Sequence, residues 1–243
     1  MLRPKADAAD LVPGDVLAAT RRSFLVGLGS LTLGACSSNP MIGGVPAQAH
    51  PTDGAAPSPA EYREWVAGFR PRALGRGISA ATYDRVMGDI TPDTAVYKFD
   101  KSQPEVQEPI WRYVDRRTGE YNVTTGRKRI QEHAGLWDRI EARYGVDRYL
   151  LCALWGMESS FGDLVVSPKY NRAVMPCLAA LAWGEPRRRA YWEAELLNAL
   201  VIVDRGWAQP SEMIGSWAGA MGHTQWMPEV WLNMGVDFDG DGR

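Results

Sequence analysis

The sequence has 243 residues, of which 45% are hydrophobic and 23% charged, a balance that suits a globular protein with one sizeable core or two small ones. Its formal net charge of −2 leaves no broad basic field, which argues against binding to nucleic acid or, through charge, to an anionic membrane surface. Ten tryptophans are unusual for this length, and their rings can stack on sugars as well as fill a core.

The N-terminal residues have the pattern of an export signal. Arg21 and Arg22 are followed by a Phe-Leu pair, which resembles the twin-arginine signal. The apolar stretch from Phe24 to Ala35 is about a dozen residues long, whereas a membrane-spanning helix needs about 20. We therefore predict a twin-arginine-type signal peptide over residues 1–36 and no transmembrane helix there.

The signal ends in Leu-Gly-Ala-Cys, which resembles the lipobox of bacterial lipoproteins. In such a sequence the thiol of the cysteine, here Cys36, is acylated and the cysteine becomes the mature N-terminus. The alternative is an ordinary signal peptide in which this cysteine is incidental. Residues 37–57 are rich in Ser, Pro, Gly and Ala, so we expect a flexible linker between a lipid anchor and a folded domain over residues 58–243.

The other two cysteines, Cys152 and Cys177, both lie in apolar runs. An oxidising periplasm permits a disulfide between them, although free thiols also pack well in apolar surroundings. Pairing requires a geometry that a sequence does not give, and two buried free thiols are the favoured interpretation.

Helical signals open the folded part. Ser58, Pro59 and Glu61 have the spacing of a helix start with a capping box. An apolar face at helical spacing follows, formed by Tyr62, Trp65, Val66 and Phe69. The next such positions indicate a second short helix: Ile78, Thr82 and Val86. From Thr91 to Gly126 no period is clear and three prolines occur, which predicts mostly loop with short helical pieces.

Periodicity returns at Ile130 and continues to Tyr144, so we predict one helix that Gly145 ends. Asp147 can cap the next helix, which runs to Glu158 and is apolar on nearly all sides. Such a helix is expected at the centre of the fold.

A further amphipathic helix is predicted from Arg187 to Val203. No stretch of the chain shows sustained alternation of apolar and polar residues, which is the period of a half-buried strand. The fold class is therefore predicted to be mainly α.

Glu158 is the charged residue at the end of the apolar helix, after Leu-Leu-Cys-Ala-Leu-Trp-Gly-Met. Burial there would disfavour the charged form, and the partial negative charge at a helix C-terminus acts in the same direction. A carboxyl kept protonated near neutral pH is what general-acid cleavage of a glycosidic bond requires. The alternative is a glutamate that turns out to solvent where the helix ends.

Residues 215–228 concentrate glycines, small residues and large aromatics, in the order Gly-Ser-Trp-Ala-Gly-Ala-Met-Gly-His-Thr-Gln-Trp-Met-Pro. Glycines let the backbone approach a ligand closely, and the amide of Gln225 offers both a donor and an acceptor to a sugar. The alternative is a tight packing motif between a helix and a loop.

Together, the Glu-Ser-Ser-Phe-Gly segment at 158–162 and residues 215–228 resemble the B-type lytic murein transglycosylases, which have a lysozyme-like α domain. The resemblance runs from about Tyr62 to the last residue. It implies that Glu158 is the only catalytic carboxyl and that further residues line the sugar cleft: Ser216, Gln225, Arg187, Arg188 and Tyr113. His223 is assigned to the same cleft, at a position where many members have tyrosine.

The substrate that this resemblance implies is the glycan strand of peptidoglycan, with no cofactor required. Glu158 would protonate the bridging oxygen of the β-1,4 bond between N-acetylmuramic acid and N-acetylglucosamine, while the substrate's own 2-acetamido oxygen stabilises the anomeric centre. Glu158 would then take the proton of the muramic C6 hydroxyl, which closes a 1,6-anhydro ring without consuming water. The resemblance, and not the residues, favours this hydroxyl over water as the nucleophile.

The last residues match the opening of an EF-hand loop, with Asp237, Asp239 and Asp241 at positions 1, 3 and 5 and a glycine at position 6. Members of the resembled family can carry a calcium loop. The sequence ends before the bidentate acid that completes such a loop, so only weak calcium binding is expected, and a solvated acidic turn is the alternative. The family's domain continues past this loop, so we also expect that the C-terminal part of the domain is missing.

These expectations describe a monomeric periplasmic lipoprotein, anchored to a membrane (the outer membrane), that cleaves peptidoglycan. One alternative is a muramidase that hydrolyses the same bond. Another is a non-catalytic peptidoglycan-binding lipoprotein, against which the intact Glu158 and Gln225 argue. A calcium-sensing module finds little support in half a loop.

Overall fold

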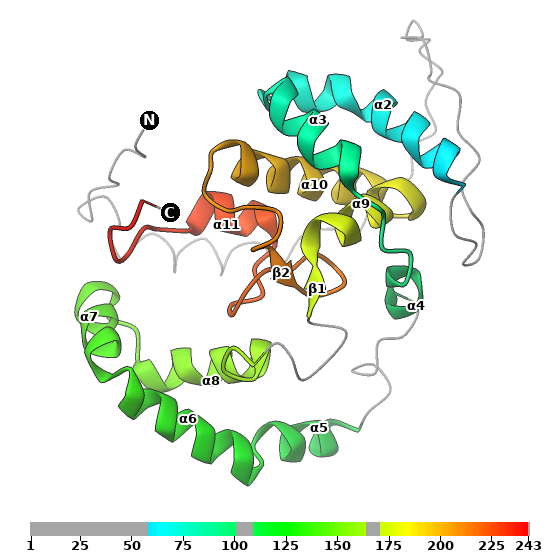
Figure 1. Ribbon diagram of the computed structural model, residues 1–243. Coiled ribbons are helices and arrows are strands. Elements are labelled where there is room, and N and C mark those ends of the chain that lie inside the picture. Colours follow the sequence, from blue (N-terminus) through cyan, green and yellow to red (C-terminus); the bar gives the residue numbers. More distant parts are fainter. Residues whose placement is uncertain (1–57, 101–108, 164–170, 243) are drawn as a thin grey trace, which may run out of the picture. The chain divides into compact units, whose positions relative to one another are not determined.

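The structure is a computed structural model that describes residues 58–100, 109–163 and 171–242. The predicted signal peptide, Cys36 and the linker lie outside these residues. The described part is built almost wholly from helices (Figure 1): α2 (Pro59–Gly75), α3 (Ala80–Asp89), α4 (Val96–Asp100), α5 (Ile110–Arg117), α6 (Glu120–Glu132), α7 (Ala134–Tyr144), α8 (Arg148–Ser159), α9 (Val174–Gly184), α10 (Arg189–Asp204) and α11 (Pro228–Met234). Among the described residues, none of these helices has the length and apolarity needed to cross a membrane.

Two short strands, β1 (Arg172–Ala173) and β2 (Ile214–Gly215), pair antiparallel, with Arg172 opposite Gly215. This pair ties the start of α9 to the segment that carries the second sequence motif (Figure 1). The predicted mainly α class is confirmed.

The start of α2 forms as the sequence predicts. The Ser58 hydroxyl accepts a hydrogen bond of 3.2 Å from the Glu61 backbone, and the Glu61 carboxylate accepts one of 3.3 Å from the Ser58 backbone. This reciprocal pair satisfies two backbone donors that a helix start otherwise leaves without partners. The face that the helix buries carries Tyr62, Trp65, Phe69 and Ala73.

The main core centres on α9 and α10, which pack against each other and carry α3 and α11 on α10. Every residue of α9 except Pro176 is buried, so this helix is apolar all round and lies inside the fold. The expectation that the helix ending at Glu158 would be central is wrong, because α9 and α10 occupy that place. On α8 only Cys152 and Ser159 are buried.

A second, smaller core holds the helices around Glu158 together. Its buried members are Trp137, Cys152 and Phe161, with partly buried side chains of α6, α7 and α8 packed around them. Cys152 belongs to this small core and Cys177 to the main one, and both are buried free thiols, as favoured from the sequence.

Two helix boundaries differ from the expectations. The region expected to be mostly loop ends in a regular helix, since α6 begins at Glu120. The single helix expected from Ile130 to Tyr144 is broken at His133, whose φ of −115° and ψ of 27° separate α6 from α7. The indole N–H of Trp137 donates to the Arg129 carbonyl across this break, at 3.3 Å, which holds the bend between the two helices.

A buried carboxylate joins the main core to α11. Glu195 on α10 is 1% exposed, and its Oε2 accepts a hydrogen bond of 3.0 Å from the backbone N–H of Glu229. Burial raises the pKa of the Glu195 carboxyl above its usual value of 4.5, while the hydrogen bond from the Glu229 backbone acts in the opposite direction. The folded protein therefore binds a proton at Glu195 more tightly than the unfolded chain does.

Glu195→Gln should remove a pH-dependent part of the stability. In the wild type, the Glu195 contribution to the free energy of unfolding falls as the pH rises from the usual pKa through the raised folded pKa, because ionisation costs more in the folded state. The amide keeps the shape and an oxygen acceptor but does not ionise. The melting temperature of the variant relative to wild type should therefore rise as the pH increases above the usual glutamate pKa of 4.5. A constant or falling difference would mean that the hydrogen bond to α11 outweighs burial.

Candidate active site

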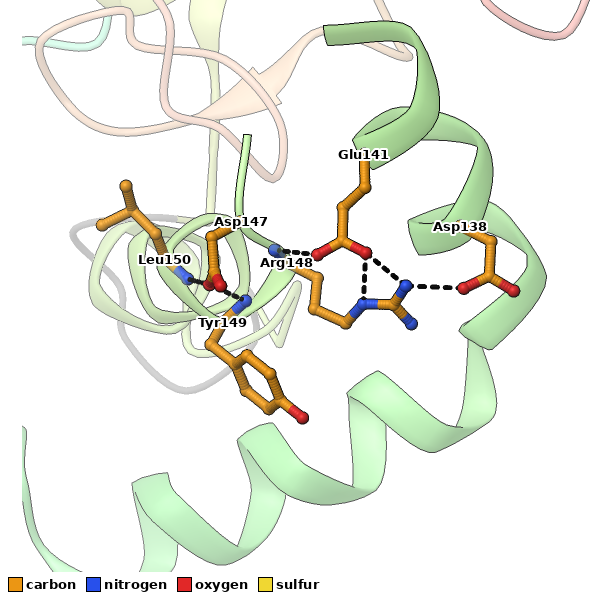
Figure 2. A network of polar contacts seen from close by, with 6 residues as sticks. All are labelled: Asp138, Glu141, Asp147, Arg148, Tyr149 and Leu150. Atoms are coloured by element: carbon orange, nitrogen blue, oxygen red, sulfur yellow. Dashed lines mark hydrogen bonds and ion pairs between the residues drawn. The ribbon is translucent and has the colours of Figure 1, made fainter. Parts of the chain in front are cut away.

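The start of α8 is fixed by two sets of polar contacts (Figure 2). The Asp147 carboxylate caps the helix by accepting hydrogen bonds from the backbones of Tyr149, at 2.7 Å, and Leu150, at 3.0 Å. The Arg148 guanidinium pairs with Glu141 and Asp138 of α7. Hydrogen bonds from the Arg148 side chain hold the pKa of Glu141 below its usual range, so this pair stays ionised at neutral pH.

Glu158 lies in the last turn of α8, and its side chain is exposed. The expectation of a buried carboxyl at this position is therefore wrong. Glu158 is exposed because α8 lies at the surface, where its apolar residues Leu150, Leu154 and Met157 are themselves 57%, 46% and 43% exposed. The carboxyl is open to a ligand approaching from solvent.

The three residues that end the Glu158 motif form a tight left-handed turn. The φ angles of Ser160, Phe161 and Gly162 are 51°, 62° and 86°, a region that costs about 1–2 kcal/mol for each residue with a side chain. Two contacts hold the turn. The backbone N–H of Gly162 donates to the Ser159 hydroxyl at 3.0 Å, and the Phe161 ring is buried in the small core.

Phe161 fits because Gly156 has no side chain. A Cβ on Gly156 would lie 2.5 Å from the Phe161 ring, far inside van der Waals contact. Phe161 therefore folds back beneath the turn of α8 that precedes Glu158, and the direction in which the chain leaves Glu158 is set by this packing.

Arg117 of α5 contacts the residue next to Glu158. Its guanidinium donates a hydrogen bond of 3.1 Å to the Met157 carbonyl and lies over the Tyr113 ring, 5.3 Å from the ring centre. Arg117 thus lies between the Glu158 end of α8 and Tyr113, one of the residues assigned to the cleft. The contact joins residues 40 positions apart, and no local pattern in the sequence indicates it.

An apolar cavity of about 340 Å³ lies between α6 and α8. Its lining includes Val123 and Ile130 of α6 and Ala153, Gly156 and Met157 of α8. The cavity therefore reaches the residue that precedes Glu158.

The second motif forms a compact, crossed loop after β2. The backbone N–H of Ser216 donates to the Ala220 carbonyl at 2.8 Å, and the Ala220 backbone donates to the Ser216 hydroxyl at 3.2 Å. Ser216 is 6% exposed, and the bond from Ala220 uses one of the two lone pairs of its hydroxyl oxygen, which leaves the hydroxyl hydrogen and the other lone pair for a sugar. Further along, Met221 pairs with Trp226.

Gln225 lies at the tip of this loop in a left-handed conformation, with φ of 50°. Its side-chain amide donates to the Gly222 carbonyl at 2.8 Å, which leaves the amide oxygen and one N–H of Gln225 for a ligand. His223, between these two residues, stacks on Trp155 of α8, with ring centres 5.7 Å apart and an angle of 17° between the planes. The helix that carries Glu158 and the loop of the second motif thus meet at this pair of rings.

The arginine pair lies between α9 and α10. Arg187 is exposed, and its Nε donates to Glu185 at 3.0 Å. Arg188 lies over the rings of Tyr191 and Trp192 on α10, at 4.5 and 4.8 Å from their centres. These contacts fix both guanidinium groups near the start of α10.

The acidic turn after α11 brings three carboxylates together. Oxygen atoms of Asp237, Asp239 and Asp241 all lie within 4.8 Å of one another, and all three residues are exposed. The backbone of Gly240 donates to Asp237 at 2.7 Å, as expected for a tight Asp-rich turn. Phe238 anchors the turn on Tyr144 of α7, with ring centres 6.2 Å apart. The donor set of clustered carboxylates suits a hard cation such as calcium.

Comparison with known proteins places the chain in a family. The family described as Transglycosylase SLT domain matches residues 61–243 of the chain. The membrane-bound lytic murein transglycosylase B of Escherichia coli (strain K12) is 29% identical over 160 residues, which are 65% of this chain and 42% of that protein.

Solved structures of similar proteins support the same family. SltB3 from Pseudomonas aeruginosa, in complex with NAG-anhNAM-pentapeptide, is 43% identical with a TM-score of 0.69, covering 75% of this chain and 47% of that one. The soluble lytic transglycosylase SltB1 from the same organism is 26% identical with a TM-score of 0.66, covering 74% and 59%. The predicted lysozyme-like fold and family are confirmed, and the chain spans less than two thirds of the length of each of these relatives.

Proposed function

Because the chain belongs to the Transglycosylase SLT domain family, we propose that it is a lytic transglycosylase that cleaves the glycan strands of peptidoglycan. The matched residues include both motifs, and the stacking of Trp155 on His223 is the observation that carries the proposal. This contact brings the helix of the exposed Glu158 to the loop of Gln225, which supports the assignment of the acid and the amide to one site.

In this mechanism Glu158 protonates the bridging oxygen of the β-1,4 bond between N-acetylmuramic acid and N-acetylglucosamine. The 2-acetamido oxygen of the substrate stabilises the anomeric centre in place of a second carboxylate. The Glu158 carboxylate then takes the proton from the C6 hydroxyl of the muramic acid, and the oxygen of that hydroxyl bonds to C1. Glu158 ends the cycle protonated, no water is consumed, and the product carries a 1,6-anhydro ring.

Sugar binding is assigned to the residues that the resemblance to the transglycosylases places in the cleft. The Gln225 amide oxygen and its second N–H, the hydroxyl of Tyr113, and the guanidinium groups of Arg187 and Arg188 can donate to or accept from hydroxyl and acetamido groups. Ser216 contributes its hydroxyl hydrogen. The relatives named as lytic transglycosylases support lyase chemistry over hydrolysis.

Digestion of purified sacculi followed by mass spectrometry of the soluble muropeptides tests this function. A lytic transglycosylase releases fragments with 1,6-anhydromuramic ends, which are lighter by one water than the reducing fragments that a muramidase releases. Reducing ends would replace the lyase by the hydrolase. Binding to sacculi without any release would favour the remaining alternative, a non-catalytic peptidoglycan-binding lipoprotein.

For the acidic turn we propose weak calcium binding by Asp237, Asp239 and Asp241, with no cofactor needed for the chemistry. Three clustered carboxylates repel one another, and a bound cation removes that repulsion. Millimolar calcium should raise the melting temperature by roughly a degree or two relative to chelator, since few ligands contribute. Asp239→Asn should abolish the shift, whereas Asp84→Asn on α3 should keep it. A large shift would require further ligands from elsewhere.

For localisation we propose the periplasm, with the protein anchored to the outer membrane through lipid on Cys36 after processing of the signal over residues 1–36. Residues 37–57 then form the linker to a domain that begins at residue 58 and acts as a monomer. The name of the Escherichia coli relative, a membrane-bound enzyme, supports attachment to a membrane.

A further inference from the structure

We propose that His223 is a positioning residue, whose ring holds the Glu158 end of α8 against the loop that carries Gln225. The effect of His223 on catalysis rests on the proposed function, whereas the contact that its ring makes does not depend on that function. His223 is predicted from the sequence to touch the sugar, and in the structure its side chain is exposed but also makes two contacts within the protein.

The first contact is with Trp155. The two rings are stacked, with centres 5.7 Å apart and planes at 17°. Trp155 is itself held from other sides, by the Arg129 guanidinium at 5.9 Å, by His133 at 5.9 Å and by Phe161 at 5.8 Å. Because Trp155 is one turn before Glu158 on α8, a ring seated on it is coupled to the position of the carboxyl.

The second contact is with Gly162, four residues after Glu158. A Cβ on Gly162 would lie 2.5 Å from His223 Cε1 and 2.7 Å from Nε2, so the imidazole rests directly on the bare backbone of this glycine. His223 therefore touches the chain on both sides of Glu158. Gly162 also has φ of 86°, which suits glycine in any case, but the absent side chain is what admits the ring.

The loop that presents His223 is braced from its own side. The Gln225 amide donates to the Gly222 carbonyl at 2.8 Å, and the Met221 backbone donates to the Trp226 carbonyl at 2.8 Å. A shift of His223 would therefore move Gln225 with it. The geometry makes the imidazole a spacer that sets the distance between the acid and the sugar-binding amide, and its flat aromatic shape matters more than its hydrogen-bonding nitrogens.

Three variants separate this role from a direct sugar contact: His223→Ala, His223→Phe and His223→Tyr. The alanine variant should lose about ten- to a hundredfold in kcat on sacculi with a smaller change in KM, since the acid is misplaced relative to the bound bond. The phenylalanine and tyrosine variants keep a ring that stacks on Trp155 and should recover most of the activity. If the phenylalanine variant is as impaired as alanine, with the loss in KM, His223 binds sugar and the positioning role is overturned.

A measurement without substrate tests the contact itself. The chain has three histidines, so the imidazole C–H signals in a proton–carbon NMR spectrum can be assigned by deleting each histidine in turn. The His223 protons should be shifted upfield by the Trp155 indole, and Trp155→Leu should return them to ordinary positions. Unshifted His223 signals in the wild type would refute the stack. An inactive wild type that still shows the shift would instead count against the proposed function alone.

Discussion

Replacing Glu158 by glutamine should abolish strand cleavage and leave the fold and sacculus binding nearly intact. The amide has the shape of the carboxyl but can neither donate the proton to the bridging oxygen nor take one from the C6 hydroxyl. A loss of about 10²–10⁴-fold or more in the rate of anhydromuropeptide release is expected. Because the Glu158 side chain is exposed, the substitution disturbs no buried contact, and the melting temperature should hardly change.

Glu64→Gln is the matched control for this variant. Glu64 is also an exposed glutamate within a helix, α2, and the same loss of charge there should leave cleavage unchanged. Co-sedimentation with sacculi shows whether the Glu158 variant still binds its substrate. Retention of most of the activity in Glu158→Gln would assign the acid to another residue, and equal losses in both variants would point to net charge as the cause.

The sequence correctly predicts the structural features that depend only on neighbouring residues. The Ser58 capping box, the Asp147 cap and the left-handed Gly145 with φ of 66° are all present, because each depends on residues within one helical turn. The type of fold follows from such helices. The two motifs also indicate the family correctly, since short runs of glycine and aromatic residues with a glutamate are specific in their order.

Burial is predicted less well, because the apolar character of a side chain does not determine which other element packs over it. Leu150 and Leu154 favoured a central position for α8, yet both are exposed. The helix that is in fact buried all round, α9, shows no helical period, since apolar residues at every position produce none, and it carries Pro176 in its first turn. For the same reason the sequence favours a buried Glu158, whereas the structure has the alternative, a glutamate exposed where the helix ends.

The contacts that assemble the site cannot be inferred from local sequence patterns. Trp155 and His223 are 68 positions apart, and the hydrogen bond from Arg117 to the Met157 carbonyl is also long-range. Their identities are visible in the sequence, but their meeting depends on how α8 and the loop after β2 pack.

Gly215→Ala should destabilise the fold and lower the rate of cleavage, because the loop of the second motif crosses itself at this residue. A Cβ on Gly215 would lie 1.8 Å from the Ala220 carbonyl oxygen and 3.0 Å from Met221 Cα, and both of these atoms are backbone. No side-chain rotation relieves such an overlap, so the pairing of Gly215 with Arg172 and with Met221 has to open. We expect a destabilisation at or above the top of the usual range for overpacking, about 3 kcal/mol.

Gly222→Ala in the same loop separates this overlap from the general cost of losing a glycine. Gly222 has φ of 61°, and a Cβ there would meet no atom within 4 Å, so alanine costs only the left-handed conformation, about 1–2 kcal/mol. Urea unfolding of both variants should therefore rank Gly215→Ala as clearly less stable. Cleavage of sacculi, measured where circular dichroism shows both folded, should fall on the order of a hundredfold in Gly215→Ala, since Gln225 and His223 lose their support. Equal stability in the two variants would show that the crossing can loosen at little cost, and that Gly215 does not fix the loop.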